Sequence, residues 1–192
     1  MSLLKGLFGG QSDNILTSLR TIIGNEKGKF PIQKIFDEFK GNVDKNYTFS
    51  EDVIESFLEE EYGSATCSLT LLLLYPDVVL EHGNAIAQDH MHPKTMFEDL
   101  EKLHSLGLSA DQESFFTNRK NYNSVLNLQL LEEVKNKSKN DDSLANWAKA
   151  NSKSNADLYL EENTDLDIKQ FEAFIEVRKK QLTAKLKSIL EV

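Results

Sequence analysis

The chain has 192 residues, of which 40% are hydrophobic and 28% are charged, and its formal net charge is −9. This length allows one substantial core, or one small domain with a helical appendage, and the composition excludes wholesale disorder. The negative charge excludes a surface built uniformly to bind nucleic acid, because phosphate contacts require clustered Lys and Arg. A locally basic groove, or an acidic site offset by a divalent cation, remains open.

Cys67 is the only cysteine of the chain. A single cysteine excludes an intrachain disulfide and any zinc knuckle built from cysteine pairs, and it fits a reducing cytoplasm. The sequence has no apolar run long enough to cross a bilayer and no secretory signal. We therefore expect a cytoplasmic protein without a membrane partner.

Apolar residues in the first third recur at helical spacing, and we find no constellation of catalytic side chains there. This spacing predicts helices over 15–23, from Pro31 to Gly41, after Ser50 and from Ser64 to Tyr75. The acids Glu59-Glu60-Glu61 are unfavourable for the helix dipole where they stand, so we expect a solvated edge there. Residues 1–76 are expected to form a helical scaffold.

The middle of the sequence has β-branched and alternating character from Asp77 to Pro93. Gly83-Asn84 indicates a turn between Val78-Val79-Leu80 and a strand expected over 86–91. The elements expected next are a helix over 95–106 with Met96, Phe97, Leu100 and Leu103 inward, a helix over 110–119, a strand over 124–130 and a helix over 132–139. Residues 77–140 are thus the expected mixed core.

The last part, 141–192, is predicted to be helical and to pack on that core. Ser143 can cap a short helix, and Thr164 with Asp167 forms a near capping box for a long terminal helix. The buried stripe of that helix is expected to contain Phe171, Phe174, Ile175, Leu182, Leu186 and Ile189. The predicted fold class is α+β and predominantly helical.

Candidate chemistry is concentrated in Asp89-His90-Met91-His92-Pro93-Lys94 and in two later segments, Asn127-Leu128-Gln129-Leu130-Leu131 and Asn136-Lys137-Ser138-Lys139. Adjacent residues on a strand point to opposite faces, so Asp89 and His90 share a site only near a strand end, which Pro93 provides. Asn136 and Lys139 are spaced to share one helical face. The short passage from the second strand to this helix gives a strand–strand–helix layout.

The order Asp-His, Asn-Leu and Asn-x-x-Lys resembles that of the HNH endonucleases, the ββα-metal or His-Me finger group. With DHMHPKTMF, NLQLL, NKSK, Trp147 and the terminal FIEVR, the chain resembles the helical middle and nuclease end of GmrSD-like type IV restriction proteins. Thr95 stands after the Pro-Lys pair, where these proteins frequently have Ser. Those proteins also carry an N-terminal ParB-like nucleotide-hydrolysing domain, which is expected here as a missing partner, the chain being a fragment or a shortened relative.

The resemblance implies a site for DNA hydrolysis with one divalent ion, Mg²⁺ or alternatively Mn²⁺. Asp89 and Asn136 would hold the ion, because such hard cations prefer oxygen ligands. His90 would be the general base, Asn127 would tie the loop after the first strand to the second strand, and Lys139 would face the scissile phosphate. Further contacts to phosphate or DNA would come from His92, Lys94, Lys135, Lys137, Arg119 and Lys120.

Each of these residues also has a structural explanation. Asp89 and His90 can form a hydrogen-bonded pair at a strand end, and His92 can be a packing or surface residue. Asn127 can be a turn residue, Asn136 and Lys139 a solvated helix face, and the other cations ordinary surface charges. His82 and His104 are expected to be structural or exposed, and Trp147 to pack in the core.

The sequence therefore predicts a metal-dependent HNH endonuclease domain acting on DNA, with restriction or phage defence implied by the resemblance alone. The alternative is a non-catalytic DNA- or protein-binding module with a degenerate or silent nuclease fold. The acidic net charge and the missing partner domain favour that alternative.

Overall fold

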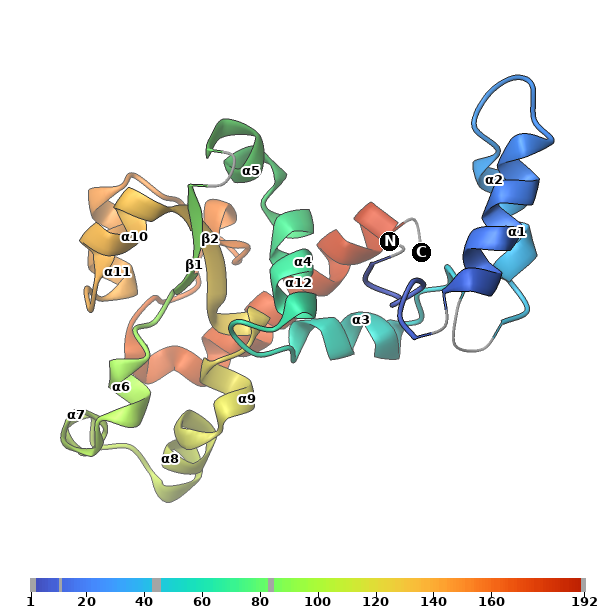
Figure 1. Cartoon of the computed structure of the whole chain (residues 1–192). Helices are drawn as coiled ribbons and strands as arrows, with labels where there is room; N and C mark the ends of the chain where they lie inside the picture. Colours follow the sequence, from blue (N-terminus) through green and yellow to red (C-terminus); the bar gives the residue numbers. More distant parts are fainter. Residues whose placement is uncertain (1–2, 11, 43–45, 83–84, 191–192) are drawn as a thin grey trace. The chain divides into compact units, whose positions relative to one another are not determined.

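The computed structural model of the chain describes residues 3–10, 12–42, 46–82 and 85–190, so the predicted turn Gly83-Asn84 lies outside the described residues (Figure 1). Two compact units are present, Met1–Ser50 and Glu51–Val192. Their boundary falls inside the predicted scaffold of residues 1–76, and the later helices of that scaffold belong to the unit that contains the sheet. In the described ranges, no helix combines the length and hydropathy needed to span a bilayer.

The first unit contains the two helices predicted for it, α1 (Asp13–Gly24) and α2 (Ile32–Phe39). Their apolar stripes meet because residues three and four apart on a helix share one face. The buried residues of this small core are Leu7, Ile15, Ile35 and Phe39, with Leu19, Ile22 and Tyr47 packed against them. No residue with predicted chemistry belongs to this unit.

The second unit is mainly helical and contains a two-stranded antiparallel sheet of β1 (Ile86–His90) and β2 (Leu128–Glu132). In its register Asp89 lies opposite Gln129, and His90 lies opposite Leu128. The helix α10 (Glu133–Lys139) follows β2 without a loop and packs against both strands (Figure 1). The predicted α+β class with a helical majority is confirmed.

Helices α3 (Glu51–Leu58) and α4 (Ala65–Leu74) begin where the sequence predicts helices. The hydroxyl of Ser64 accepts a hydrogen bond from the amide of Cys67 at 3.0 Å, and Ser143 caps α11 (Leu144–Ala150) in the same way at 3.3 Å. Both predicted caps are therefore confirmed. They satisfy backbone amides that a helix start leaves without an intrahelical partner.

The predicted extended character of Val78-Val79-Leu80 is wrong, because these residues lie in α5 (Pro76–His82). Pro76 stands at the first helical position, where its missing amide proton has no effect, and this placement outweighs the strand preference of the valines. Strand β1 then begins close to the predicted start.

The single helix predicted over 95–106 is divided into α6 (Thr95–Glu98) and α7 (Leu100–Ser105). Asp99 has an extended backbone between them, and its carboxylate accepts hydrogen bonds from the amides of Glu101 and Lys102. This break redirects the helix, so that Leu100 is 61% exposed instead of buried as predicted, while Phe97 and Leu103 are buried.

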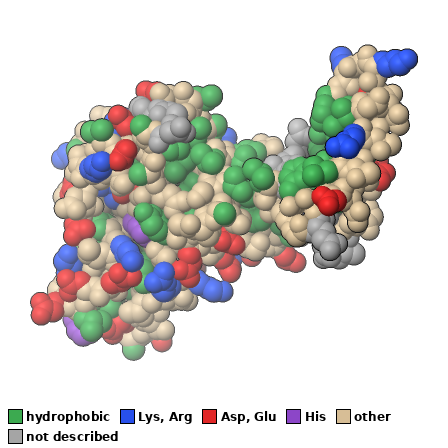
Figure 2. Space-filling view, in the orientation of Figure 1, with side chains coloured by type: hydrophobic (Ala, Val, Ile, Leu, Met, Phe, Trp, Pro, Cys, Tyr) green, Lys and Arg blue, Asp and Glu red, His purple; other side chains and the backbone are tan. Residues whose placement is uncertain are grey.

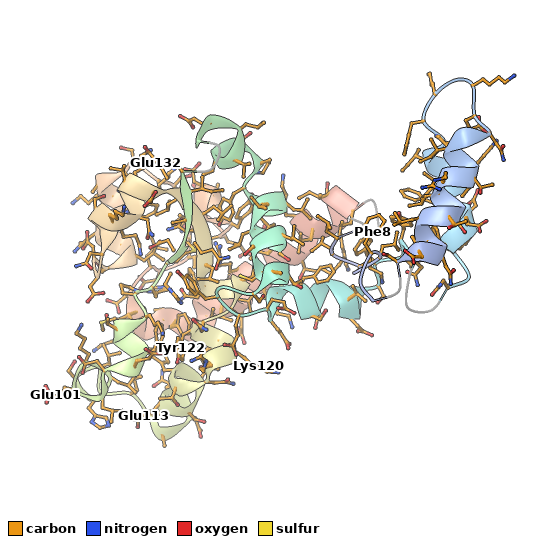
Figure 3. All side chains as sticks on the ribbon, viewed as in Figure 1. Phe8, Glu101, Glu113, Lys120, Tyr122 and Glu132 are labelled. Carbon is orange, nitrogen blue, oxygen red and sulfur yellow. The ribbon has the colours of Figure 1, made fainter. Side chains whose placement is uncertain are left out.

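The segment before β2 is also less extended than predicted. Helices α8 (Ala110–Thr117) and α9 (Arg119–Tyr122) are followed by the 3₁₀ helix η1 (Val125–Asn127), and the strand begins only at Leu128. In Figure 3, Tyr122 and Lys120 extend from α9; Tyr122 is buried and Lys120 is exposed. The 3₁₀ turn places Asn127 in the core at the start of the strand.

The long terminal helix is confirmed as α12 (Phe171–Leu190), which packs on α3, α4 and α8. Its predicted capping box is not formed. Asp167 instead caps the 3₁₀ helix η3 (Ile168–Gln170), which precedes α12 and follows η2 (Ala156–Leu158). The buried apolar residues of α12 are Phe171, Phe174, Ile175, Leu182, Leu186 and Leu190.

Arg178 lies fully buried in the middle of the apolar face of α12. Its guanidinium donates hydrogen bonds to the carbonyl of Leu158, to the carbonyl of Leu128 at 2.7 Å and to the Tyr75 hydroxyl at 2.9 Å. A buried cation is tolerated only when such partners replace its water. Arg178 thereby fixes α12 to the first residue of β2.

We expect Arg178→Met to lower the free energy of unfolding by about 3 kcal/mol, because buried acceptors would lose their charged donor. Urea unfolding followed by circular dichroism would measure the change. Lys180→Met is the matched control, since Lys180 is 73% exposed and should change the stability by less than about 0.5 kcal/mol. Equal stabilities of the two variants would contradict the structural role of Arg178.

Candidate functional site

The last residues of β1 open into a pocket of about 210 Å³ that is also lined by the helix following β2. Asp89, His90 and Asn136 all line it, as the sequence predicts. Asp89 and His90 are adjacent on the strand, and both reach one pocket because β1 ends at His90. Other lining residues are Tyr62, Gln88, Pro93, Lys94, Thr95, Asn140 and Asp141.

Asp89 is a buried carboxylate whose oxygens are already paired. Its Oδ2 accepts a hydrogen bond from Gln129 Nε2 at 2.9 Å, across the sheet. The Lys139 ammonium lies 3.1 Å from Oδ2 and 3.3 Å from Oδ1, and it also donates to the carbonyl of His90. Burial raises the pKa of Asp89, while the Lys139 charge and the Gln129 amide act in the opposite direction.

Lys139 does not lie on a solvated helix face, the structural alternative considered for it. Its side chain is 0% exposed, and its ammonium faces Asp89 from the end of α10. A carboxylate removed from water needs a nearby positive charge, which is the physical reason for this inward orientation. Asp89 therefore reaches the pocket with its carboxylate already paired to a buried cation.

His90 is held from two sides. Its Nε2 lies 3.0 Å from Asn123 Oδ1, and its ring stacks on Tyr62 with centroids 5.1 Å apart and an interplanar angle of 22°. Burial lowers the pKa of His90, and the charges of Lys94 and Lys139 lower it further, against the opposing hydrogen bond to Asn123. A neutral imidazole is the form that can take a proton from water.

The hydrogen bonds continue from Asn123 to Glu61, for which the sequence predicts only a solvated edge. Asn123 Nδ2 donates to Glu61 Oε2 at 3.1 Å, and Arg119 donates to the same oxygen through Nε at 3.1 Å and Nη2 at 2.9 Å. The Arg119 and Asn123 hydrogen bonds lower the pKa of Glu61. The sequence contains no motif that joins these residues to His90.

Asn127 makes the tie that the sequence predicts for it. Its buried amide accepts from the backbone amide of His92 at 3.0 Å and donates to the carbonyls of His92 at 3.0 Å and Tyr122 at 2.8 Å. Its own carbonyl accepts from the amide of Met91 at 2.8 Å. The segment directly after His90 is thus fixed to the start of β2.

His92 does not have the predicted phosphate- or water-contacting position. It is only 1% exposed, and its ring packs edge-on against Phe171 and Phe174 with centroids 5.5 and 4.7 Å apart. Burial lowers its pKa to about 3, so the ring is neutral. The packing alternative for His92 is therefore confirmed, and Trp147, which is 4% exposed, is likewise a core residue.

The cations that were predicted to contact phosphate or DNA lie next to acidic side chains. Lys94 pairs with Glu98 at 3.2 Å, and the other cations pair with acids in the same way: Lys135 with Glu132, Lys137 with Glu133, Arg119 with Glu61 and Lys120 with Glu59. In Figure 2, positive and negative side chains are interspersed on the face shown. Among the described residues, Lys94 lines the pocket and the other named cations do not.

The pocket offers oxygen ligands of the kind that a hard divalent cation prefers. Asp89 supplies a carboxylate and Asn136 an amide oxygen, which are ligands that Mg²⁺ accepts when water or phosphate oxygens complete its shell. No group of three or more His, Cys, Asp or Glu suited to a metal occurs in the described part of the chain, so any ion here would depend on such mixed oxygen ligands. Both oxygens of Asp89 are already engaged by the Lys139 ammonium and the Gln129 amide, so an ion at Asp89 would have to displace the ammonium.

Comparison with protein-family models finds none that matches this chain, and comparison with curated proteins finds no match either. The resemblance to HNH nucleases therefore depends on the sequence motifs alone.

We expect Lys139→Met to lower the free energy of unfolding by about 3 kcal/mol, because it leaves the buried Asp89 carboxylate without its counter-charge. Lys137→Met is the matched control on the same helix. Its exposed ion pair with Glu133 is worth less than about 1 kcal/mol. Urea unfolding of both variants tests this, and similar small losses would show that the Asp89–Lys139 pair is not the structural ion pair described here.

Proposed function

We propose that this chain is a metal-dependent endonuclease of the HNH (ββα-metal) type that hydrolyses phosphodiester bonds in DNA. One observation carries the proposal: a carboxylate, an imidazole and a helix-borne amide share one pocket at the end of a two-stranded antiparallel sheet. The helix that supplies Asn136 follows the second strand directly. This arrangement supports the roles that the HNH resemblance implies for Asp89, His90 and Asn136.

In the proposed reaction, His90 accepts a proton from the attacking water. Its lowered pKa keeps the ring neutral, as a base requires, and its stacking on Tyr62 limits rotation of the ring. Asp89 and Asn136 would hold the ion, which when bound supplies positive charge at the leaving oxygen. Lys94, which is 42% exposed at the pocket, is the cation placed to contact a phosphate.

The proposed substrate is DNA, and a role in restriction or phage defence is proposed from the resemblance to GmrSD-like proteins alone. A ParB-like nucleotide-hydrolysing domain is the proposed partner on the same ground. The interspersed surface charges support a local contact at the pocket over a broad basic interface.

A second candidate function is favoured by the Asp89–Lys139 ion pair. An ammonium bound to the carboxylate can replace a metal ion permanently, which would leave a binding module with a silent nuclease fold. Displacement of Lys139 by a divalent ion distinguishes the two candidates, because only a nuclease needs that exchange.

We expect the purified chain to nick supercoiled plasmid in Mg²⁺ or Mn²⁺ and to be inactive in chelator. His90→Ala should lower the single-turnover rate by roughly 10²- to 10⁴-fold, the usual contribution of a general base. Agarose-gel analysis of the plasmid forms provides the measurement. His104→Ala is the control, since His104 is exposed and pairs with Glu113 outside the pocket. Undiminished cleavage by His90→Ala would contradict the assignment of the base.

Metal binding gives a test that does not depend on cleavage. Isothermal titration with Mn²⁺ should show binding that Asp89→Asn weakens at least about tenfold, equivalent to about 1.4 kcal/mol. Lys139→Met should bind Mn²⁺ more tightly than the wild type, because no ammonium has to be displaced from Asp89. Asp142→Asn, an exposed change outside the pocket, is the control. Absence of binding in both the wild type and Lys139→Met would favour the silent module.

A further inference from the structure

Two segments far apart in the sequence are joined beside His90. The amide of Tyr62 donates to the carbonyl of Asn123 at 2.8 Å, and the amide of Val125 donates to the carbonyl of Glu60 at 3.0 Å. These hydrogen bonds flank a bridge between Glu61 and Ser124. The side chains of Glu61 and Asn123 are therefore brought together by backbone pairing as well as by their own hydrogen bond.

The Glu61 carboxylate decides how the Asn123 amide is oriented. An ionised carboxylate only accepts hydrogen bonds, so the group that Asn123 presents to it has to be the amide nitrogen. Reversing the amide would place its oxygen against the carboxylate, where the two would repel. The amide oxygen consequently faces His90, which is the arrangement that the structure contains.

An amide oxygen facing a histidine nitrogen in turn decides the position of the imidazole proton. Asn123 Oδ1 can only accept, so His90 Nε2 has to donate and carries the proton in the neutral ring. The other nitrogen, Nδ1, is then left with a free lone pair. This is the nitrogen that can take a proton from water.

Arg119 holds the far end of this chain of hydrogen bonds. Its two donors to Glu61 Oε2 fix the carboxylate and favour its ionised form. Asn123 is only 3% exposed, so water does not readily replace its partners. The chain thus runs from an exposed cation through Glu61 and Asn123 to His90.

We propose that Asn123 and Glu61 are positioning residues that fix the tautomer of His90, with the proton on Nε2 and Nδ1 free. The effect of this tautomer on DNA cleavage depends on the proposed function, whereas the tautomer itself does not. Neither residue belongs to the Asp-His, Asn-Leu or Asn-x-x-Lys motifs.

The decisive variants change which partner donates. In Glu61→Gln the side chain keeps its size but can donate as well as accept, so the Asn123 amide is free to reverse. In the double variant Glu61→Gln with Asn123→Asp, the introduced amide can donate to the introduced carboxylate, which again offers His90 only an acceptor. Glu59→Gln makes the same chemical change at an exposed acid that pairs with Lys120.

The tautomer is read by long-range ¹H–¹⁵N NMR of the full chain with ¹⁵N-labelled histidine, at a pH where the ring is neutral. His90→Gln identifies the His90 signals by their loss. We expect a protonated Nε2 and an unprotonated Nδ1 in the wild type and in Glu59→Gln. Glu61→Gln should give a mixture of tautomers, and the double variant should restore the wild-type pattern.

Plasmid nicking by the wild type, Glu59→Gln, Glu61→Gln and the double variant tests the catalytic consequence. The rate constant for Glu61→Gln should fall roughly 10- to 100-fold, less than the roughly 10²- to 10⁴-fold expected for complete loss of the base, with little change in the DNA concentration giving half-maximal rate. The double variant should recover most of this loss. A purely structural role would lower the stability of Glu61→Gln without a change of tautomer and without recovery in the double variant.

The outcomes separate the two proposals. A His90 protonated on Nδ1 in the wild type, or a tautomer unaffected by Glu61→Gln, overturns the positioning role. The expected tautomers in a protein that cleaves no DNA under any condition support the positioning role and count against the nuclease function. The expected tautomers, together with a cleavage rate that falls in Glu61→Gln and recovers in the double variant, support both the positioning role and the nuclease function.

Discussion

The buried amide of Asn127 is the interaction on which the site depends. Its hydrogen bonds to both backbone groups of His92 stop β1 from continuing along β2 and bind the departing segment to the start of the second strand. Because the strand ends there, Asp89 and His90 line the same pocket although they are neighbours on the strand. A side chain with both a donor and an acceptor is required, which is why a polar residue stands in this fully buried position.

Two buried cations hold the same end of the sheet. Lys139 from α10 donates to the carbonyl of His90, and Arg178 from α12 donates to the carbonyl of Leu128, the residue opposite His90 in the register. Lys139 has the Asp89 carboxylate as its counter-charge, whereas Arg178 donates hydrogen bonds to neutral oxygens. Removing water from such charges is unfavourable unless other partners replace it, so the sheet end and the two helices constrain one another.

The features that the sequence predicted well have local causes. Ser64 and Ser143 cap helices through neighbours three residues away, and Pro93 follows shortly after the end of strand β1. Lys139 and Arg178 depend instead on distant partners: the solvated helix face considered for Lys139 is wrong, and an apolar helix face gave no indication of a buried Arg178. Pairing of Glu61 with Asn123 likewise follows from tertiary contacts that no local pattern contains.

These distant contacts change which parts of the chain form the candidate site. The Asp-His motif supplies the imidazole, but the stacking surface and the hydrogen-bonded carboxylate come from Tyr62 and Glu61, between α3 and α4. The helices that the sequence indicated only as a scaffold therefore also position His90. A strand–strand–helix unit without them would retain Asp89, Asn136 and Lys139 but would leave the imidazole without its stacking partner and without a carboxylate to orient Asn123. The chemistry of the pocket is thus a property of the whole unit from Glu51 to Val192, and the Asp-His motif is only the part of it that lies at the strand end.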